Sequence, residues 1–173
     1  MKKFCLILAL AILFLIPTRG VYSEPYMRAS RTADLIIYLR PHLDPEIAAI
    51  HARYIDRYSS KWHVDRLKVI SIANLESEFR ADAKNPSGCI GAMQVNPRVH
   101  QDKLTKRRIT LHELFYLKNN YDIGSEILHD CLKSSRSFEE ALYKYSGGSK
   151  NYTRDVKKIY GRLSRLSQLP SIG

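Results

Sequence analysis

Apolar residues recur at helical spacing along most of the chain, and no segment alternates between apolar and polar residues as a strand would. A short helix is predicted over 33–40, where Pro41 ends it. Asp44 followed by Pro45 is a start signal for the next helix. The apolar residues of one face of that helix are Ile47, Ile50, Tyr54, Ile55 and Tyr58. This pattern predicts a surface helix with one face toward a core.

From Asp65 onward the apolar positions surround nearly the whole helix instead of forming a single stripe. They are Leu67, Val69, Ile70, Ile72, Ala73 and Leu75. A helix that is apolar on all sides is a central, buried one, and we expect it to end near Phe79. The segment 81–97 contains Asn85, Pro86, Ser87, Gly88 and Gly91 and is predicted to be a loop.

Two capping boxes mark helix starts in the second half of the chain, one from Thr110 to Glu113 and one from Ser137 to Glu140. They predict helices that begin at about 111 and 138, the second ending at the glycines 147–148. The apolar stripes are Ile123, Ile127, Leu128 and Cys131, then Phe138, Ala141, Leu142 and Tyr145. A final helix is predicted over 152–163, followed by a polar tail over 164–173. The fold class is therefore mainly α.

The first 23 residues have the pattern of a secretory signal peptide. Lys2 and Lys3 precede an apolar run over 4–16, and Pro17 follows it. The run is short for a membrane span, so we expect cleavage before Glu24 and no stable span in the mature chain. The predicted organisation is a signal peptide over 1–23, a lead with a short helix over 24–43, one main helical domain over 44–163 and a tail over 164–173. We therefore expect the mature protein to be an exported monomer that is periplasmic or associated with the cell envelope.

Charge narrows the choice of partner. The formal charge of +11 falls to +8 when the signal peptide removes Lys2, Lys3 and Arg19 and no acid. Outside the cytoplasm a basic surface suits the polyanionic cell envelope, and a nucleic acid is not the expected partner.

Cysteine and histidine usage gives few constraints on the site. Cys89 and Cys131 remain after processing, and an oxidising compartment allows a disulfide between them, with two free thiols as the alternative. None of the six histidines has metal-ligand spacing to another histidine or to a cysteine. We therefore expect no metal.

Two glutamates, Glu76 and Glu78, fall in the last turn of the predicted buried helix. The negative end of the helix dipole and the exclusion of water both disfavour an ionised carboxylate there. These effects raise the pKa of a carboxyl toward neutrality, as a general acid requires. The two residues are about 200° apart around a helix, so we expect Glu76 to face inward with Ile72 and Ala73, and Glu78 to face solvent. The pattern alone leaves a buried, paired carboxylate as the alternative role for Glu76.

Four short motifs follow one another in the chain: VDRLKVISIANLESEF from Val64, SGCIGAMQVNP, NNYDIG and YSGG. In this order and behind a signal peptide, they resemble the SLT-type lytic transglycosylases, which share the goose-type lysozyme fold. The resemblance covers roughly residues 44 to 160. It implies a single lysozyme-like helical domain with a substrate groove.

The resemblance also implies roles for individual residues. Glu76 matches the catalytic acid and base of the family's Glu-Ser-x-Phe motif, and Tyr145 matches the tyrosine of Tyr-Asn-Ala-Gly that reaches toward this glutamate. Gly91, Met93 and Gln94 match Gly-Leu-Met-Gln, and Asn120 with Gly124 matches Asn-x-x-x-Gly. The expected substrate-binding residues are Ser77, Met93, Gln94, Asn120 and Tyr145. The alternative role for Tyr145 is core packing on the stripe that begins at Phe138, and both roles can hold, since a phenol can pack its ring and donate its hydroxyl.

The chain departs from the family pattern at four positions near the expected groove. They are Ala92 for Leu, Cys89 for Ala, Lys144 for Ala and Ser146 for Asn. The shape of the subsites and the hydrogen bonding around Glu76 are therefore expected to differ from the usual pattern.

The implied reaction needs one carboxyl and no cofactor. Glu76 would protonate the oxygen between N-acetylmuramic acid and N-acetylglucosamine in peptidoglycan, and the 6-hydroxyl of the muramyl sugar would then close onto carbon 1. A hydrolytic lysozyme on the same fold is the nearest alternative and would need a base such as Asp82 or Asp102. A non-catalytic glycan-binding or scaffold protein of an envelope-spanning machine is the second alternative. Recruitment to an envelope assembly or secretion complex stays open.

Overall fold

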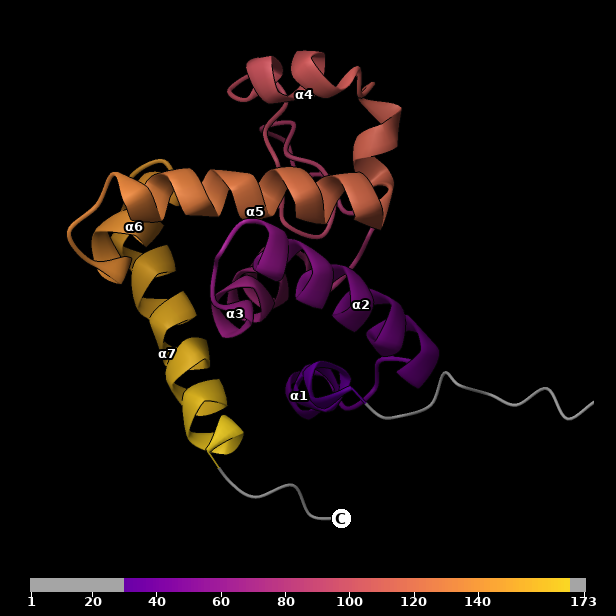
Figure 1. The fold of residues 1–173 in the computed structure, drawn as a ribbon, viewed down its shortest axis with the longest axis vertical. Helices are drawn as coiled ribbons and strands as arrows, with labels where there is room; N and C mark the ends of the chain where they lie inside the picture. The colour runs from indigo at the N-terminus through magenta and orange to yellow at the C-terminus, as the bar shows by residue number, and fades with distance from the viewer. Residues whose placement is uncertain (1–29, 169–173) are drawn as a thin grey trace, which may run out of the picture.

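The computed structural model describes residues 30–168, so the predicted signal peptide over 1–23 lies outside the described part. Within that part the chain forms seven α-helices and one short 3₁₀ helix (Figure 1). Their bounds are α1 Arg31–Leu39, α2 Pro45–Lys61, α3 Arg66–Ser77, α4 Gln101–Arg107, η1 His112–Phe115, α5 Leu117–Lys133, α6 Phe138–Tyr145 and α7 Lys150–Ser167. Between residues 30 and 168 the only β pairing is two isolated bridges, Lys84 with Ile90 and Ile90 with Val95. The prediction of a mainly helical fold is confirmed.

Side chains at the predicted start signals cap the helices. The carboxylate of Asp44 accepts hydrogen bonds from the backbone N–H groups of Glu46 and Ile47, and Ser137 Oγ accepts one from Glu140. Each bond pairs a helix N–H group that has no partner inside the helix. The capping residues therefore fix where α2 and α6 begin.

Helix α3 is central, as the sequence predicted. Val69, Ile70, Ile72 and Ala73 are fully buried, and α3 packs against α1, α2 and α7. Figure 1 shows α3 below α5, with α2 and α7 on either side. Of its predicted apolar positions only Leu75 is exposed, at 36%. Burial on most sides gives the end of α3 a fixed position, which matters because Glu76 lies in its last turn.

Helix α5 separates two apolar clusters. Tyr121 and Leu128 belong to the main core with α1, α2 and α3, whereas Ile123 and Ile127 pack with the smaller cluster under α4 and η1. Figure 1 shows α4 on the opposite side of α5 from α1, α2 and α3. The loop from α3 to α4 crosses between these two parts.

Ion pairs fasten α4 to α5. Arg107 donates to Glu126 at 2.6 Å and to Asp122 at 3.4 Å, and Lys103 donates to Asp130 at 2.6 Å. Because Arg107 and Glu126 are mostly shielded from solvent, their pairing is worth more than an exposed ion pair. Helix α4 is thus held in a defined position on α5.

The structure corrects part of the predicted face of α2, since Ile55 and Tyr58 are buried as expected but Ile47 and Ile50 are not. Ile47 and Ile50 are 45% and 39% exposed, whereas Ala48, His51 and Ala52 face the core. Two alanines allow close approach of the neighbouring helices, and His51 meets the Tyr121 hydroxyl at 2.7 Å. The two alanines and the buried histidine contact, and not the two larger isoleucines, therefore decide which face of α2 packs against the core.

Two helix boundaries also differ from the prediction, and one helix was not predicted. The Thr110 capping box forms, but the helix it starts is only the short η1, and α5 begins at Leu117. Helix α7 continues to Ser167, so the predicted polar tail is helical up to that residue. Helix α4 was not predicted, because Leu104 is its one buried residue and it has no apolar stripe.

Candidate active site

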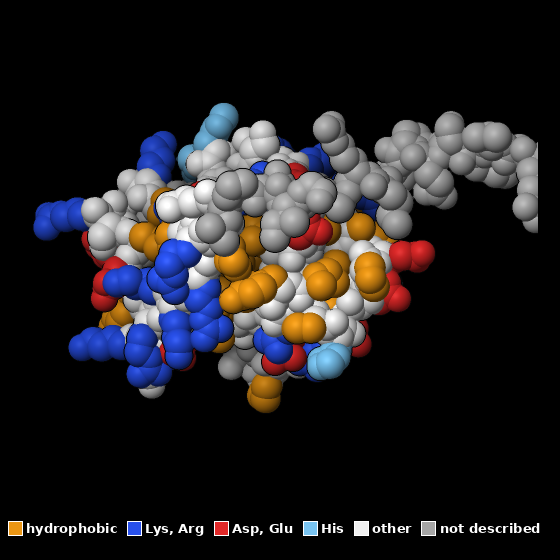
Figure 2. Space-filling view, turned by 90° about the horizontal axis from the view of Figure 1, so that it is seen from below, with side chains coloured by type: hydrophobic (Ala, Val, Ile, Leu, Met, Phe, Trp, Pro, Cys, Tyr) orange, Lys and Arg blue, Asp and Glu red, His pale blue; other side chains and the backbone are white. Residues whose placement is uncertain are grey.

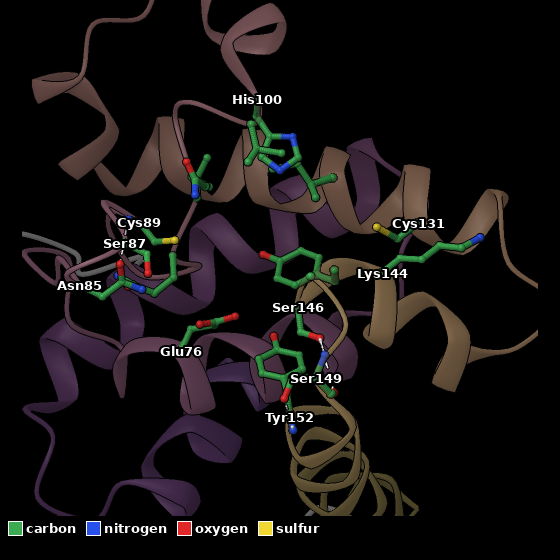
Figure 3. A pocket seen from close by; sticks show the side chains of 17 residues that line it. Glu76, Asn85, Ser87, Cys89, His100, Cys131, Lys144, Ser146, Ser149 and Tyr152 are labelled. Carbon is green, nitrogen blue, oxygen red and sulfur yellow. Dashed lines mark hydrogen bonds between the residues drawn. The ribbon is translucent and has the colours of Figure 1, made fainter.

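A pocket of about 450 Å³ lies between the end of α3, the loop that follows it, α5 and the α6–α7 turn. The lining side chains include Glu76 from α3, His100 at the start of α4 and Tyr152 from α7 (Figure 3). Segments far apart in the sequence thus converge on one open groove.

Glu76 occupies the groove half-buried, in the last turn of α3. Burial raises the pKa of its carboxyl from an ordinary 4.5 to about 7, and hydrogen bonding with the Tyr152 hydroxyl lowers it by a smaller amount. A carboxyl with this pKa holds a proton at neutral pH and can also release it. This is the protonation behaviour that the acid–base role expected from the sequence requires.

Glu76 is the one carboxylic acid among the described residues that line the pocket. Glu78 points away and pairs with Arg40 at 3.1 Å, with 59% of its side chain exposed. Neither Asp82 nor Asp102 lines the pocket. The groove therefore offers one carboxyl for chemistry.

The turn after Glu76 is strained. Glu78 and Phe79 both have left-handed backbone conformations, with φ of 56° and 64°, which are costly for residues other than glycine. The buried imidazole of His51 hydrogen-bonds to the backbone of Phe79 and to the Tyr121 hydroxyl. Burial lowers the pKa of His51 to about 4, so the imidazole is uncharged at neutral pH. Its two hydrogen bonds hold the turn at the end of α3 from the side of the core.

Asn120 fixes the loop that forms the opposite side of the groove. Its Oδ1 accepts from the Met93 N–H at 2.7 Å, and its Nδ2 donates to the carbonyls of Ile90 and Leu114 at 2.8 and 2.9 Å. The asparagine is fully buried, so these bonds are shielded from water and costly to lose. Asn120 is thus a fastening point between the loop and α5.

Two glycines make this fastening sterically feasible. A Cβ at Gly91, whose φ is +78°, would lie 2.2 Å from Asn120 Nδ2, and a Cβ at Gly124 would lie 2.6 Å from Met93 Sδ. Both distances are below any ordinary contact. Gly91, Met93, Asn120 and Gly124 therefore form one interlocked unit, which we term the loop clasp.

Ser77, Met93 and Asn120, which the sequence suggested as substrate-binding residues, lie behind the wall of the groove. All three side chains are buried and none lines the pocket. Ser77 Oγ donates to the carbonyl of Ala92 at 2.8 Å, while Met93 and Asn120 belong to the loop clasp. These residues position the groove wall. The polar groups of Ser77 and Asn120 are already hydrogen-bonded to the backbone, and the side chain of Met93 packs against α5.

Gln94 does line the pocket. Its Nε2 donates to the carbonyls of Gly91 at 3.0 Å and Ala83 at 3.2 Å. These bonds use the donor end of the amide, so the acceptor Oε1 is the end available to a sugar hydroxyl or acetamido N–H.

Two tyrosines lie beside Glu76. Tyr145 lines the groove as predicted, but its hydroxyl donates to the Met93 carbonyl at 3.0 Å. Tyr152 stacks on it, with ring centroids 6.4 Å apart and planes 16° from parallel. Sequence reasoning assigned Tyr152 only to the final helix, and no motif marked it as a groove residue. Figure 3 shows its hydroxyl end turned toward the Glu76 carboxyl.

Cys89 and Cys131 are both free thiols, so the disulfide that the sequence allowed is not formed. Both line the pocket, as do Lys144 and Ser146. Within residues 30–168, no three His, Cys, Asp or Glu residues gather as metal ligands would. None of the described helices is both long and apolar enough to cross a bilayer.

A helical domain with one proton-holding carboxyl in a groove between two apolar clusters has the organisation of a lysozyme-like enzyme. The family model of the transglycosylase SLT domain matches residues 53–167, and the chain belongs to this family. That membership confirms the resemblance found in the sequence and places the protein among lysozyme-like domains with a lytic transglycosylase role on peptidoglycan. Comparison with curated proteins found no match.

Proposed function

We propose that this protein is an exported lytic transglycosylase that cleaves the β-1,4 linkage between N-acetylmuramic acid and N-acetylglucosamine in peptidoglycan. Its product would be a 1,6-anhydromuramyl end. The observation that carries the proposal is Glu76, the single carboxyl among the described residues that line the groove, with a pKa of about 7.

The reaction proceeds in two steps with one acid–base group. Glu76 gives its proton to the glycosidic oxygen, the bond from that oxygen to carbon 1 breaks, and the N-acetyl group of the muramyl sugar stabilises the cationic carbon. The Glu76 carboxylate then takes the proton of the 6-hydroxyl, whose oxygen bonds to carbon 1. Glu76 is protonated again and no water is consumed.

The lining of the groove favours this path over hydrolysis. Hydrolysis of a glycoside usually needs a second carboxylate at a defined separation, to activate water or to attack carbon. Asp82 and Asp102, the residues a hydrolytic lysozyme would have used, do not line the pocket. A substrate that supplies its own nucleophile has no need of them.

The surface charge suits an envelope polymer. Figure 2 shows Lys and Arg side chains gathered on the side of the molecule where α6 and α7 lie. Helix α7 carries six basic residues, Lys150, Arg154, Lys157, Lys158, Arg162 and Arg165. We propose that the protein works in the periplasm or at the cell envelope, where this charge attracts anionic wall material.

Digestion of purified sacculi tests the proposal. The wild type should release fragments that mass spectrometry finds one water lighter than reducing-end fragments, and Glu76→Gln should release none while still binding glycan. Glu78→Gln, a carboxyl two residues away that faces solvent, is the matched control and should clear the wall normally. Reducing ends alone would indicate hydrolysis, and clearing by Glu76→Gln would remove Glu76 from the mechanism.

A further inference from the structure

A second groove shares a wall with the groove that holds Glu76. It has a volume of about 730 Å³ and lies between the loop from α3 to α4, α4 itself and the turn after α4. Asn85 and Cys89 of this loop line the Glu76 groove. Their immediate neighbours Lys84 and Ile90 line the second groove. Since no described residue lines both spaces, the loop separates them, and we term the second one the α4 groove.

The floor of the α4 groove is aliphatic. Ile90 and Leu104 are buried, and Ile109 packs on the apolar cluster to which they belong. Leu111, which also lines the groove, is 59% exposed. Such a surface favours contact with an apolar side chain. A sugar would have to bury hydroxyls against this floor without hydrogen-bond partners, which is costly.

Three cations, Lys84, Arg98 and Arg108, line the α4 groove together with this floor. All three are exposed, and within residues 30–168 none of their side chains has a hydrogen bond, an ion pair or a ring contact. No Asp or Glu of the described chain lines the α4 groove. Glu113 lies close to its edge, but the Glu113 carboxylate already accepts hydrogen bonds from the Thr110 N–H and hydroxyl, both at 2.8 Å. The α4 groove thus presents positive charge that is not neutralised.

The cations of α4 differ in what they pair with. Lys103 and Arg107 form ion pairs with acids of α5. Arg108, the next residue, ends α4 and pairs with no acid among residues 30–168. The negative end of a helix favours a cation, but this accounts only for Arg108, because Lys84 and Arg98 lie on the loop. Cations from two segments therefore meet at one groove without a partner in the described chain.

We propose that the α4 groove binds a short acidic segment of a partner protein, with carboxylates beside Lys84, Arg98 and Arg108 and an apolar side chain on the aliphatic floor. Opposite charges would speed the encounter and orient the segment, while burial of the apolar side chain would add affinity. An anionic lipid surface is flat and would meet the cations without filling the recess. The inference goes beyond the proposed function and does not depend on it, since the α4 groove contains no residue assigned to the reaction. A partner bound there would contact the loop whose other side borders the Glu76 groove.

Fluorescence polarisation tests the proposal by measuring the binding of labelled peptides to the full-length protein. The charged probe is a short peptide of Leu residues separated by pairs of Glu, and the neutral probe has Gln in place of each Glu. We expect the charged probe to bind about tenfold more tightly, because three carboxylate–cation contacts of modest strength add together. The difference between the two probes should shrink at high salt.

Variants then locate the binding. Arg98→Gln with Arg108→Gln removes two of the cations and should weaken binding of the charged probe about five- to tenfold. Leu111→Ser should weaken both probes about threefold, because it removes apolar contact area. The matched control, Arg162→Gln with Arg165→Gln, removes the same charge from α7 and should change affinity by less than about twofold. All five residues are exposed, so each variant should keep the far-UV circular dichroism spectrum of the wild type.

The absence of saturable binding by the charged probe would overturn the proposal, and so would equal affinity for the two probes. Equal weakening by the α4-groove and α7 double variants would also overturn it, because net charge and not the groove would then govern binding. Competitors test the other occupants. Peptide-free glycan strands or phosphatidylglycerol vesicles that displace the charged probe, and that bind the Arg98→Gln, Arg108→Gln variant more weakly than the wild type, would assign the groove to wall polymer or lipid instead.

Discussion

Replacing Glu76 by glutamine should stabilise the protein at neutral pH while abolishing its activity. The pKa of this carboxyl is about 7 in the folded protein against an ordinary 4.5, and one pH unit is worth roughly 1.4 kcal/mol. The ionised carboxyl therefore costs up to about 3 kcal/mol of folding free energy, and roughly 2 kcal/mol once partial contact with solvent is allowed for. Glutamine has nearly the same shape and avoids this cost.

The pH window follows from the direction of the shift. Below pH 4.5 the carboxyl is protonated in both states, so the variant and the wild type should have similar stability. Between pH 4.5 and about 7 the unfolded chain has released a proton that the folded protein still holds, so the wild-type free energy of unfolding falls as pH rises. The advantage of Glu76→Gln should grow across this window and level off above pH 7.

His51 acts in the opposite direction over nearly the same range. Its pKa is about 4 in the folded protein against 6.5 ordinarily, so its contribution is complete above pH 6.5 and is lost as pH falls toward 4. The two slopes partly cancel in the wild type. In Glu76→Gln the His51 slope is left, and His100, whose pKa burial also lowers, adds a slope of the same sign, so stability should rise with pH between 4 and 6.5.

Urea unfolding at pH steps from about 4 to 8, followed by far-UV circular dichroism and by the fluorescence of the single tryptophan, Trp62, measures these slopes. Glu78→Gln is the control: its carboxyl is exposed and paired with Arg40, so it should change stability by less than about 1 kcal/mol at every pH. A Glu76→Gln advantage that does not grow with pH, or a variant less stable than wild type at pH 8, would refute the reasoning.

Three further predictions follow from the site. Gly124→Ala would place a Cβ 2.6 Å from Met93 Sδ and should lower the free energy of unfolding by about 1–3 kcal/mol; unchanged urea midpoints would show that Met93 can move aside. Asn120→Ala removes the partner of the buried Met93 N–H and of the Leu114 carbonyl, while the Ile90 carbonyl still accepts from the Val95 N–H; it should cost about 3 kcal/mol together with most wall-clearing activity, and a loss below about 1 kcal/mol would argue against the clasp. With a Glu76 pKa of about 7, kcat/KM should decline about tenfold per pH unit above pH 7; a decline that begins below pH 5 would assign the acid to another group.

Much of the fold was predictable because local signals agreed with tertiary packing. The Asp44 and Ser137 caps form as expected, and the all-round apolar pattern of 65–79 marked the central helix. Glu76 stood out for a related reason: a carboxyl in the last turn of a buried helix is costly, and the cost is visible in the sequence.

Other features depended on partners that the sequence does not display. Ile47 and Ile50 are more apolar than His51, yet His51 is buried because Tyr121 and the backbone of Phe79 satisfy its ring. Tyr152 lies on α7, and the apolar pattern of this helix indicates only which of its residues face the core. Its proximity to Glu76 arises from the α6–α7 turn, which brings the first turn of α7 to the groove.

The residues that match the motifs quoted from the sequence and the residues that depart from them lie in different parts of the site. Gly91, Met93, Asn120 and Gly124, which match the family, interlock behind the groove wall, where any change in volume or hydrogen bonding would displace the loop. Three of the four departures, Cys89, Lys144 and Ser146, line the groove itself. The fourth, Ala92, is buried and presents its carbonyl to Ser77. Since the clasp fixes the loop on α5 while the lining side chains decide what a ligand contacts, changes in the lining can alter the surface of the groove without displacing the loop that faces Glu76.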